Sequence, residues 1–117
     1  MKITLDKNAG FCFGVTNAVA QTLKTIKEKK EKRVFTYGPL IHNRQVTDEL
    51  VKKGVAEITN LSEHLDLDSL VIIRSHGVPK SVFDEINSKG FEFMNCTCPF
   101  VSRIHKIVQE KYNNGYK

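Results

Sequence analysis

The chain alternates between segments of helical and of extended hydrophobic pattern. Apolar residues recur at helical spacing in four segments, which predicts helices over residues 15–29, 43–54, 79–89 and 99–112. Short apolar or alternating runs, bounded by Gly, Pro or charged residues, predict strands over residues 2–5, 33–37, 55–58, 69–74 and 91–94. Residues 61–67 read as a connector with one helical turn. The continuous apolar run at 69–74 predicts a strand that is buried on both faces.

This alternation indicates an α/β fold. Strands that take turns with helices predict a parallel sheet, here of about four strands flanked by helices in a three-layer αβα arrangement. The last helix, from Pro99, is followed by no further strand up to Lys117, whereas a βα unit requires a returning strand. We therefore expect a fragment of a longer protein.

Composition narrows the class of protein. At 117 residues, with 40% hydrophobic and 26% charged residues, the chain has the size and make-up of one soluble domain. The first residues alternate like a strand and meet charge at Asp6 and Lys7, which is unlike a signal peptide. Three cysteines are an odd number, which favours reduced thiols over a disulfide framework. We expect a cytoplasmic protein without a membrane segment.

The net charge of +5 comes largely from the basic run that ends the first predicted helix, between Lys24 and Arg33. Lysines at a helix end complement the helix dipole, and Glu28 and Glu31 interrupt the run. A solvated helix end is therefore the better interpretation. Binding of nucleic acid or of a membrane surface is the lesser one, since no aromatic residues are interleaved.

Reactive side chains gather at the turns that follow predicted strands. Cys12 lies between Gly10 and Gly14, and the other such side chains are His42, His76, Cys96 and Cys98. Strand ends form the ligand crevice of open α/β sheets. Thiolates select iron–sulfur clusters, zinc or copper, while imidazoles also donate hydrogen bonds to phosphate. The pattern predicts a metal or cluster beside an anionic ligand.

Each of these residues also has a plainer interpretation. Cys12 at a helix start favours ligation, because free backbone N–H groups there stabilise an anion, and a small buried hydrophobe is the lesser interpretation. Cys96 and Cys98 could share one metal or be separated by a turn at Thr97, and their C-x-C spacing is uncommon in structural zinc sites. His42 and His76 at equivalent strand ends favour a binding role.

Four further residues are weaker candidates for a functional role. His64, in the connector, and His105, next to Lys106 on a helix, are expected to be solvated or half-buried. Arg44 and Arg74 could steer an anion, although surface ion pairs are the commoner fate of such residues.

Four motifs resemble a known family in order and spacing. They are Gly10-Phe11-Cys12-Phe13-Gly14-Val15, Ile41-His42-Asn43-Arg44, Ser75-His76-Gly77-Val78 and Thr97-Cys98-Pro99-Phe100-Val101. Together they resemble the N-terminal third of the 4-hydroxy-3-methylbut-2-enyl diphosphate reductases, the LytB family. The resemblance covers essentially the whole chain.

The resemblance implies a three-lobed α/β protein around a [4Fe-4S] cluster. Residues 1–98 would form the first lobe, and 99–117 the opening helix of a truncated second lobe. Cys12 and Cys98 would be two cluster ligands, and His42 and His76 would line the pocket for an allylic diphosphate. The third cysteine and the proton donor would lie beyond Lys117, so no catalytic residue falls within the chain, and Cys96 is expected to be accessory.

The family's reaction removes an allylic hydroxyl with two electrons, giving isopentenyl and dimethylallyl diphosphate. The resemblance thus implies an oxidoreductase of the non-mevalonate isoprenoid pathway, inactive as this fragment, with an electron donor such as ferredoxin or flavodoxin. The alternative is a stand-alone cysteine-based domain that binds a metal or senses redox state. A basic nucleic-acid-binding module ranks third.

Overall fold

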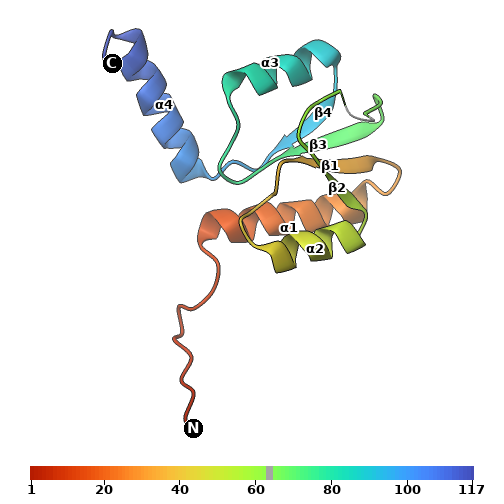
Figure 1. Ribbon diagram of the computed structural model, residues 1–117, viewed down its shortest axis with the longest axis vertical. Coiled ribbons are helices and arrows are strands. Elements are labelled where there is room, and N and C mark those ends of the chain that lie inside the picture. The colour runs from red at the N-terminus through yellow and green to blue at the C-terminus, as the bar shows by residue number, and fades with distance from the viewer. Residues whose placement is uncertain (63–64) are drawn as a thin grey trace.

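A four-stranded parallel sheet forms the centre of the protein. The computed structural model describes residues 1–62 and 65–117. The strands are β1 (Arg33–Tyr37), β2 (Val55–Ile58), β3 (Ser69–Ile73) and β4 (Glu92–Asn95), hydrogen-bonded in the order β2-β1-β3-β4 (Figure 1). All three pairings are parallel. The predicted parallel α/β sheet is confirmed.

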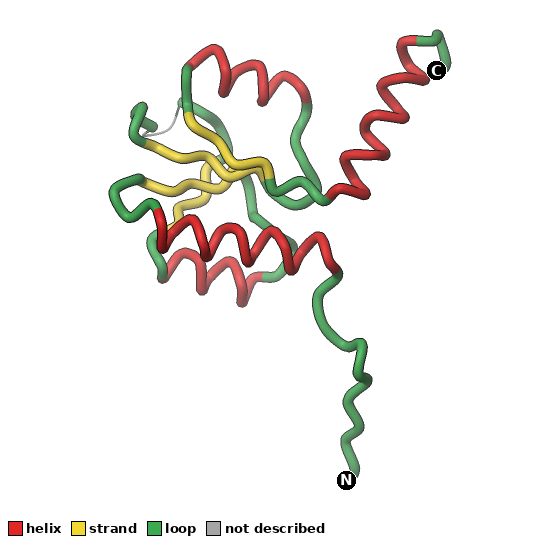
Figure 2. The backbone as a smooth tube through the Cα atoms, turned by 180° about the vertical axis from the view of Figure 1, so that it is seen from behind, coloured by secondary structure: helices red, strands yellow, loops and turns green. Residues whose placement is uncertain are grey.

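Helices cover both faces of this sheet. They are α1 (Phe13–Glu28), α2 (Arg44–Lys52), α3 (Lys80–Lys89) and α4 (Pro99–Asn113). Figures 1 and 2 show α1 and α2 side by side on one face and α3 on the other, which gives the predicted three layers. Helix α4 projects away from the sheet. In the described residues, no helix is long and apolar enough to cross a membrane.

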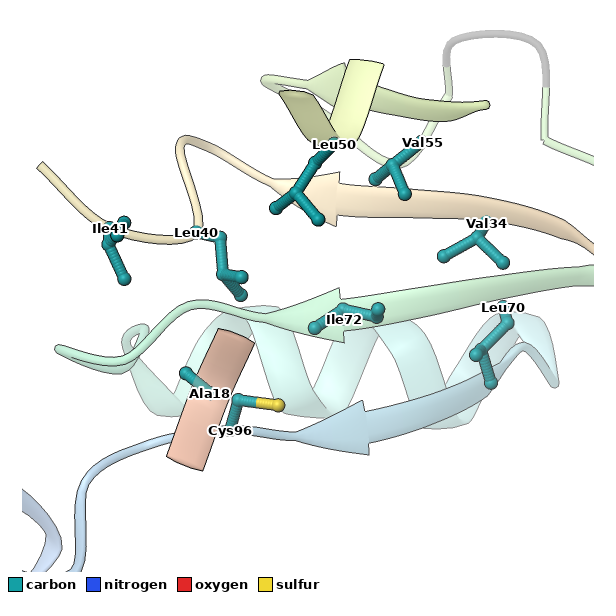
Figure 3. Close-up of a cluster of buried hydrophobic side chains, with 9 residues drawn as sticks. All are labelled: Ala18, Val34, Leu40, Ile41, Leu50, Val55, Leu70, Ile72 and Cys96. Carbon is teal, nitrogen blue, oxygen red and sulfur yellow. The ribbon is translucent and has the colours of Figure 1, made fainter. Parts of the chain in front are cut away.

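The sheet divides the hydrophobic core in two. Because side chains alternate along a strand, Leu70 and Ile72 of β3 face α1 and α2, whereas Val71 and Ile73 face α3. Every residue of β3 is buried, as its apolar run predicts. Figure 3 shows the first cluster, which consists of Ala18, Val34, Leu40, Ile41, Leu50, Val55, Leu70, Ile72 and Cys96. The second consists of Phe35, Ile58, Leu61, Val71, Ile73, Val78, Val82 and Ile86.

The predicted strand at residues 2–5 is wrong. The segment before α1 runs away from the sheet (Figure 2), and Ile3 and Leu5 are exposed. An alternating pattern forms a strand only where a neighbour supplies hydrogen bonds, and β2 and β4 are the edges of the sheet in the part of the chain that is described. The apolar side of residues 2–5 therefore has no partner there.

Element ends follow local signals with small differences. Asn43 caps α2, its side chain accepting a hydrogen bond from the Val46 N–H at 3.1 Å. Gly90 ends α3 in the left-handed conformation. Pro79 was expected inside the first turn of α3 but precedes it as the cap. The helical turn predicted within 61–67 and the placement of His64 involve residues 63–64, which lie outside the described residues.

Part of the basic run has a structural role. Lys29 and Lys32 both form ion pairs with Glu92 of β4, the second at 2.6 Å. These half-buried pairs connect the end of α1 to an edge strand. The run is therefore more than the solvated helix end that its sequence indicated.

Candidate functional site

The turns after β1, β3 and β4 are hydrogen-bonded to one another at one edge of the sheet. The Ser75 N–H donates to the Leu40 carbonyl at 3.1 Å, and the Cys98 N–H donates to the Ser75 carbonyl at 2.8 Å. The turn after β3 is therefore held between the other two. This is the carboxyl edge of a parallel sheet, where open α/β proteins bind ligands.

The two predicted histidines meet at this edge. His42 comes just before α2, and His76 follows β3. Their rings stack with centroids 4.7 Å apart and planes at 23°. His42 is exposed and His76 half-buried, so a ligand can reach the ring edges of the pair. The structure thus brings together two side chains that the sequence could only place at equivalent strand ends.

Burial lowers the pKa of His76 below its usual value, and the charges of Arg74 and His42 lower that pKa further. His76 is therefore predominantly neutral at pH 7. A neutral imidazole has one N–H donor and one acceptor nitrogen. The ring can donate a hydrogen bond to an anion with one nitrogen and accept one from a hydroxyl group or water with the other.

Cys12 and Cys98 each stand immediately before a helix. Cys12 is exposed before α1, and Cys98 is half-buried before α4. Gly14 brings the first turn of α1 against Cys98, because a β-carbon at Gly14 would lie 2.6 Å from Sγ and 2.8 Å from Cβ of Cys98. The free N–H groups of a helix start favour anions. Both cysteines thus lie next to the free N–H groups of a helix start.

Cys96 has a different environment from Cys98. Its side chain is 1% exposed and lies in the core beside Ala18 (Figure 3). Burial raises the pKa of the Cys96 thiol to about 11, partly offset by a hydrogen bond with Thr22. At neutral pH this thiol is protonated. Cys96 is thus a core residue in this structure, and the expectation that it is accessory to metal binding stays a prediction.

A turn between the two cysteines produces this difference. The side chain of Asn95 accepts hydrogen bonds from the backbone N–H of Thr97, at 3.0 Å, and from its hydroxyl, at 2.5 Å. This Asx turn ends β4 and redirects the chain into α4. The turn at Thr97, which the sequence left open, therefore places Cys96 and Cys98 in different environments.

The described residues hold only part of the ligand set of a metal or cluster. No three His, Cys, Asp or Glu side chains converge on one point among residues 1–62 and 65–117. Two accessible thiols suit iron–sulfur, zinc or copper chemistry. These two thiols are an incomplete set of ligands, and a complete site requires at least one more.

The structure adds two residues to the site. Arg74 donates a hydrogen bond from Nε to the Gly77 carbonyl at 3.0 Å, beside His76. His105 of α4 lies against Gly77, where a β-carbon would be 2.9 Å from its Cε1 atom. Sequence reasoning treated His105 as a helix-surface residue, because no local signal links it to the turn after β3. Arg44, by contrast, is exposed and pairs with Asp48 at 3.8 Å.

A groove of about 630 Å³ opens beside His76, between α3 and α4. Its walls include Arg74, His76, Val78, Phe83, His105 and Lys106. Its lining combines basic and apolar residues.

Comparison with known proteins identifies the family. The family model described as LytB protein matches residues 3–117. The chain belongs to the LytB family. A LytB relative from Alkaliphilus oremlandii, named 4-hydroxy-3-methylbut-2-enyl diphosphate reductase, is 41% identical over 116 residues, which cover 99% of this chain and 41% of the relative. One of the same name from Clostridioides difficile is 41% identical over 120 residues, covering 100% and 41%.

Solved LytB-family structures share the fold. One described as (E)-4-hydroxy-3-methyl-but-2-enyl diphosphate reductase, the terminal enzyme of the non-mevalonate pathway, has a TM-score of 0.79 at 37% identity, covering 97% of this chain and 40% of that one. The reductase from Plasmodium falciparum has a TM-score of 0.87 at 27% identity, covering 94% and 34%. The chain thus spans about two fifths of the length of the curated relatives.

Proposed function

We propose that residues 1–117 are the part of a 4-hydroxy-3-methylbut-2-enyl diphosphate reductase that binds the substrate and supplies two of the cysteine ligands of its cluster. The main observation behind the proposal is that the stacked His42 and His76 and the turn that holds Cys98 lie at the same edge of the sheet. The Cys98 N–H donates a hydrogen bond to the carbonyl of Ser75, the residue before His76. Family membership supports it, because the named relatives are reductases of this substrate.

The reaction breaks the allylic C–O bond of the substrate. Two electrons and two protons enter, the hydroxyl oxygen leaves as water, and isopentenyl or dimethylallyl diphosphate remains. A [4Fe-4S] cluster held by Cys12, Cys98 and a third thiolate from outside these residues would supply the electrons and a Lewis-acidic contact for the hydroxyl. The two accessible thiols at helix starts fit this role.

The histidine pair accounts for binding of the diphosphate. His42 and His76 present ring N–H groups on the same edge, and phosphate oxygens are strong acceptors for them. A neutral His76 also keeps an acceptor nitrogen for a substrate hydroxyl. The pair therefore holds the substrate with its hydroxyl toward the thiols, and the proton donor for the product carbon lies outside these residues.

The proposal also divides the chain into two parts that belong to different lobes. Residues 1–98 form the first lobe, and 99–117 begin a second one. The apolar side of α4 supports this, since Phe100, Ile104 and Val108 are between 59% and 69% exposed and would be covered by the rest of a longer protein. A small acidic electron donor such as ferredoxin or flavodoxin, and a cytoplasmic location, complete the proposal.

Anaerobic turnover by the full-length gene product tests this function. With a chemical reductant, the wild type should convert the substrate, Cys12→Ser and Cys98→Ser should lose nearly all activity, and His42→Asn should raise KM. Cys96→Ala is the matched control, because it removes a thiol that lies in the core. Normal turnover by Cys12→Ser would refute the proposal.

The alternative of a stand-alone metal or redox domain makes a different prediction. The observation in its favour is that two cysteines outside the core, Cys12 and Cys98, each precede a helix. Stoichiometric zinc without sulfide in protein purified anaerobically, together with no turnover, would favour that alternative.

A further inference from the structure

We infer that Arg74 is a positioning residue that holds His42 and His76 in their stack by clamping the turn after β1 to the turn after β3. Its effect on substrate turnover rests on the proposed function, whereas its effect on the two rings does not. Arg74 forms hydrogen bonds within the turn that holds His76, its guanidinium contacts Gly38, and its charge acts on the His76 ring.

Arg74 closes the turn that carries His76. The Gly77 N–H donates to the Arg74 carbonyl at 3.0 Å, and Arg74 Nε donates back to the Gly77 carbonyl at 3.0 Å. Gly77 has a φ of +79°, a conformation that residues with a side chain rarely adopt. His76 lies inside this doubly closed turn, so its backbone has little freedom.

The same guanidinium lies on the turn that leads to His42. At Gly38, where φ is +69°, a β-carbon would be 2.8 Å from Nη1 and 3.7 Å from Cδ of Arg74. The missing side chain of Gly38 is therefore the space that Arg74 fills. From Gly38 the chain passes through the buried Leu40 to His42, and the Leu40 carbonyl accepts the Ser75 N–H. The two turns are thus joined by one backbone bond and one side-chain contact.

Lysine could not form the same clamp. The guanidinium carries several N–H donors on one planar group, so Nε donates to the Gly77 carbonyl while Nη1 lies next to Gly38, whereas an ammonium group is a compact point charge. In the described ranges, 1–62 and 65–117, Arg74 forms no ion pair. Its charge therefore acts on His76 uncompensated by a bound carboxylate, and it contributes to the lowered pKa of that ring. The position of the His76 ring and its protonation state therefore both depend on Arg74.

The test uses the full-length gene product with isotope-labelled histidine rings, kept anaerobic. In the wild type, magnetisation transfer between the rings of His42 and His76 should be observed at pH 8, because their centroids are 4.7 Å apart. Arg74→Lys and Arg74→Met should both lose that transfer. The pKa of His76 should rise more in the Met variant than in the Lys variant, which keeps a charge. Arg44→Met, which alters an exposed arginine, is the control. It should change neither the transfer between the rings nor the pKa of His76.

Transfer between the rings that persists in a folded Arg74→Met protein would overturn the inference. If both variants fail to fold, hydrogen exchange of the Arg74 Nε–H in the wild type decides instead. The clamp predicts that it exchanges at least tenfold more slowly than that of Arg44, and equal rates would overturn the inference.

Turnover separates this inference from the proposed function. If the wild type turns over the substrate, Arg74→Lys should lower kcat/KM on the order of 10-fold to 100-fold, the scale expected for a misplaced substrate-binding group. An unchanged kcat/KM with unstacked rings would overturn the catalytic part. If the wild type does not turn over, the proposed function fails, and the ring measurements still decide the role of Arg74.

Discussion

Replacing Gly14 with alanine tests the contact between the first turn of α1 and Cys98. Gly14 is the second residue of α1, and its backbone is not in the left-handed region. Helix propensity alone therefore predicts that Gly14→Ala stabilises the protein by about 0.5–1 kcal/mol. The structure predicts the opposite sign.

The steric term is larger than the propensity term. The new methyl group would lie 2.6 Å from Sγ and 2.8 Å from Cβ of Cys98. Rotation about χ1 moves Sγ but leaves Cβ in place, so the start of α1 or the turn before α4 must shift. Overpacking of this kind costs about 1–3 kcal/mol, which leaves a net destabilisation of about 0–2.5 kcal/mol, or about 1 kcal/mol from the middle of both ranges.

Urea unfolding of the purified chain measures this difference. With a slope of about 2 kcal/mol per molar urea, the midpoint should fall by about 0.5 M. In a Cys98→Gly background the obstructing β-carbon is absent, so Gly14→Ala should there be stabilising, and the two substitutions should couple by about 2 kcal/mol. Additive effects, or a Gly14→Ala protein that is more stable than the wild type, would refute the reasoning.

Two further predictions concern titration. Because burial raises the pKa of Cys96 from 9.0 to about 11, its thiolate fraction at pH 8 should be about 100-fold below that of an ordinary thiol. Mass spectrometry after brief alkylation of the native chain should find Cys12 modified and Cys96 unmodified until urea is added, and early modification of Cys96 would contradict its burial. The pKa of His76 is lower in the folded than in the unfolded protein, so as pH falls below about 6.5 the unfolded state takes up the proton first and the free energy of unfolding decreases. His76→Asn should make that decrease shallower between pH 7 and pH 5 in urea titrations, and an equal slope would show that His76 does not contribute.

The sequence predicted the sheet well because its strands are marked by residues that act locally. The apolar run of β3 requires burial on both faces, and Asn43 and Gly90 stop or start helices through their own side-chain or backbone properties. Residues 2–5 carry an equally good alternating pattern, yet they form no strand. Strand formation also needs a hydrogen-bonding neighbour, which a local pattern does not reveal.

The sequence pointed to candidate residues for a site, but it did not reveal how they lie relative to one another. Motif spacing pointed to Cys12, His42, His76 and Cys98, all of which lie at turns beside helices. The stacking of the two histidines, and the contact of Gly14 with Cys98, depend on how turns far apart in sequence meet.

Arg74 illustrates the same limit. Its role depends on the bare α-carbon of Gly38 on a neighbouring strand end, and a reading along the chain could offer only anion steering or a surface ion pair. Parallel pairing of β1 with β3 brings the two positions together.

The most direct test of the central claim is the iron and sulfide content of the full-length gene product after anaerobic reconstitution, compared among Cys12→Ser, Cys98→Ser and Cys96→Ala. The account predicts that Cys96→Ala retains the iron, sulfide and visible absorption of the wild type, whereas Cys12→Ser and Cys98→Ser lose most of all three. Full cluster content in Cys12→Ser or Cys98→Ser, or its loss in a folded Cys96→Ala protein, would contradict it.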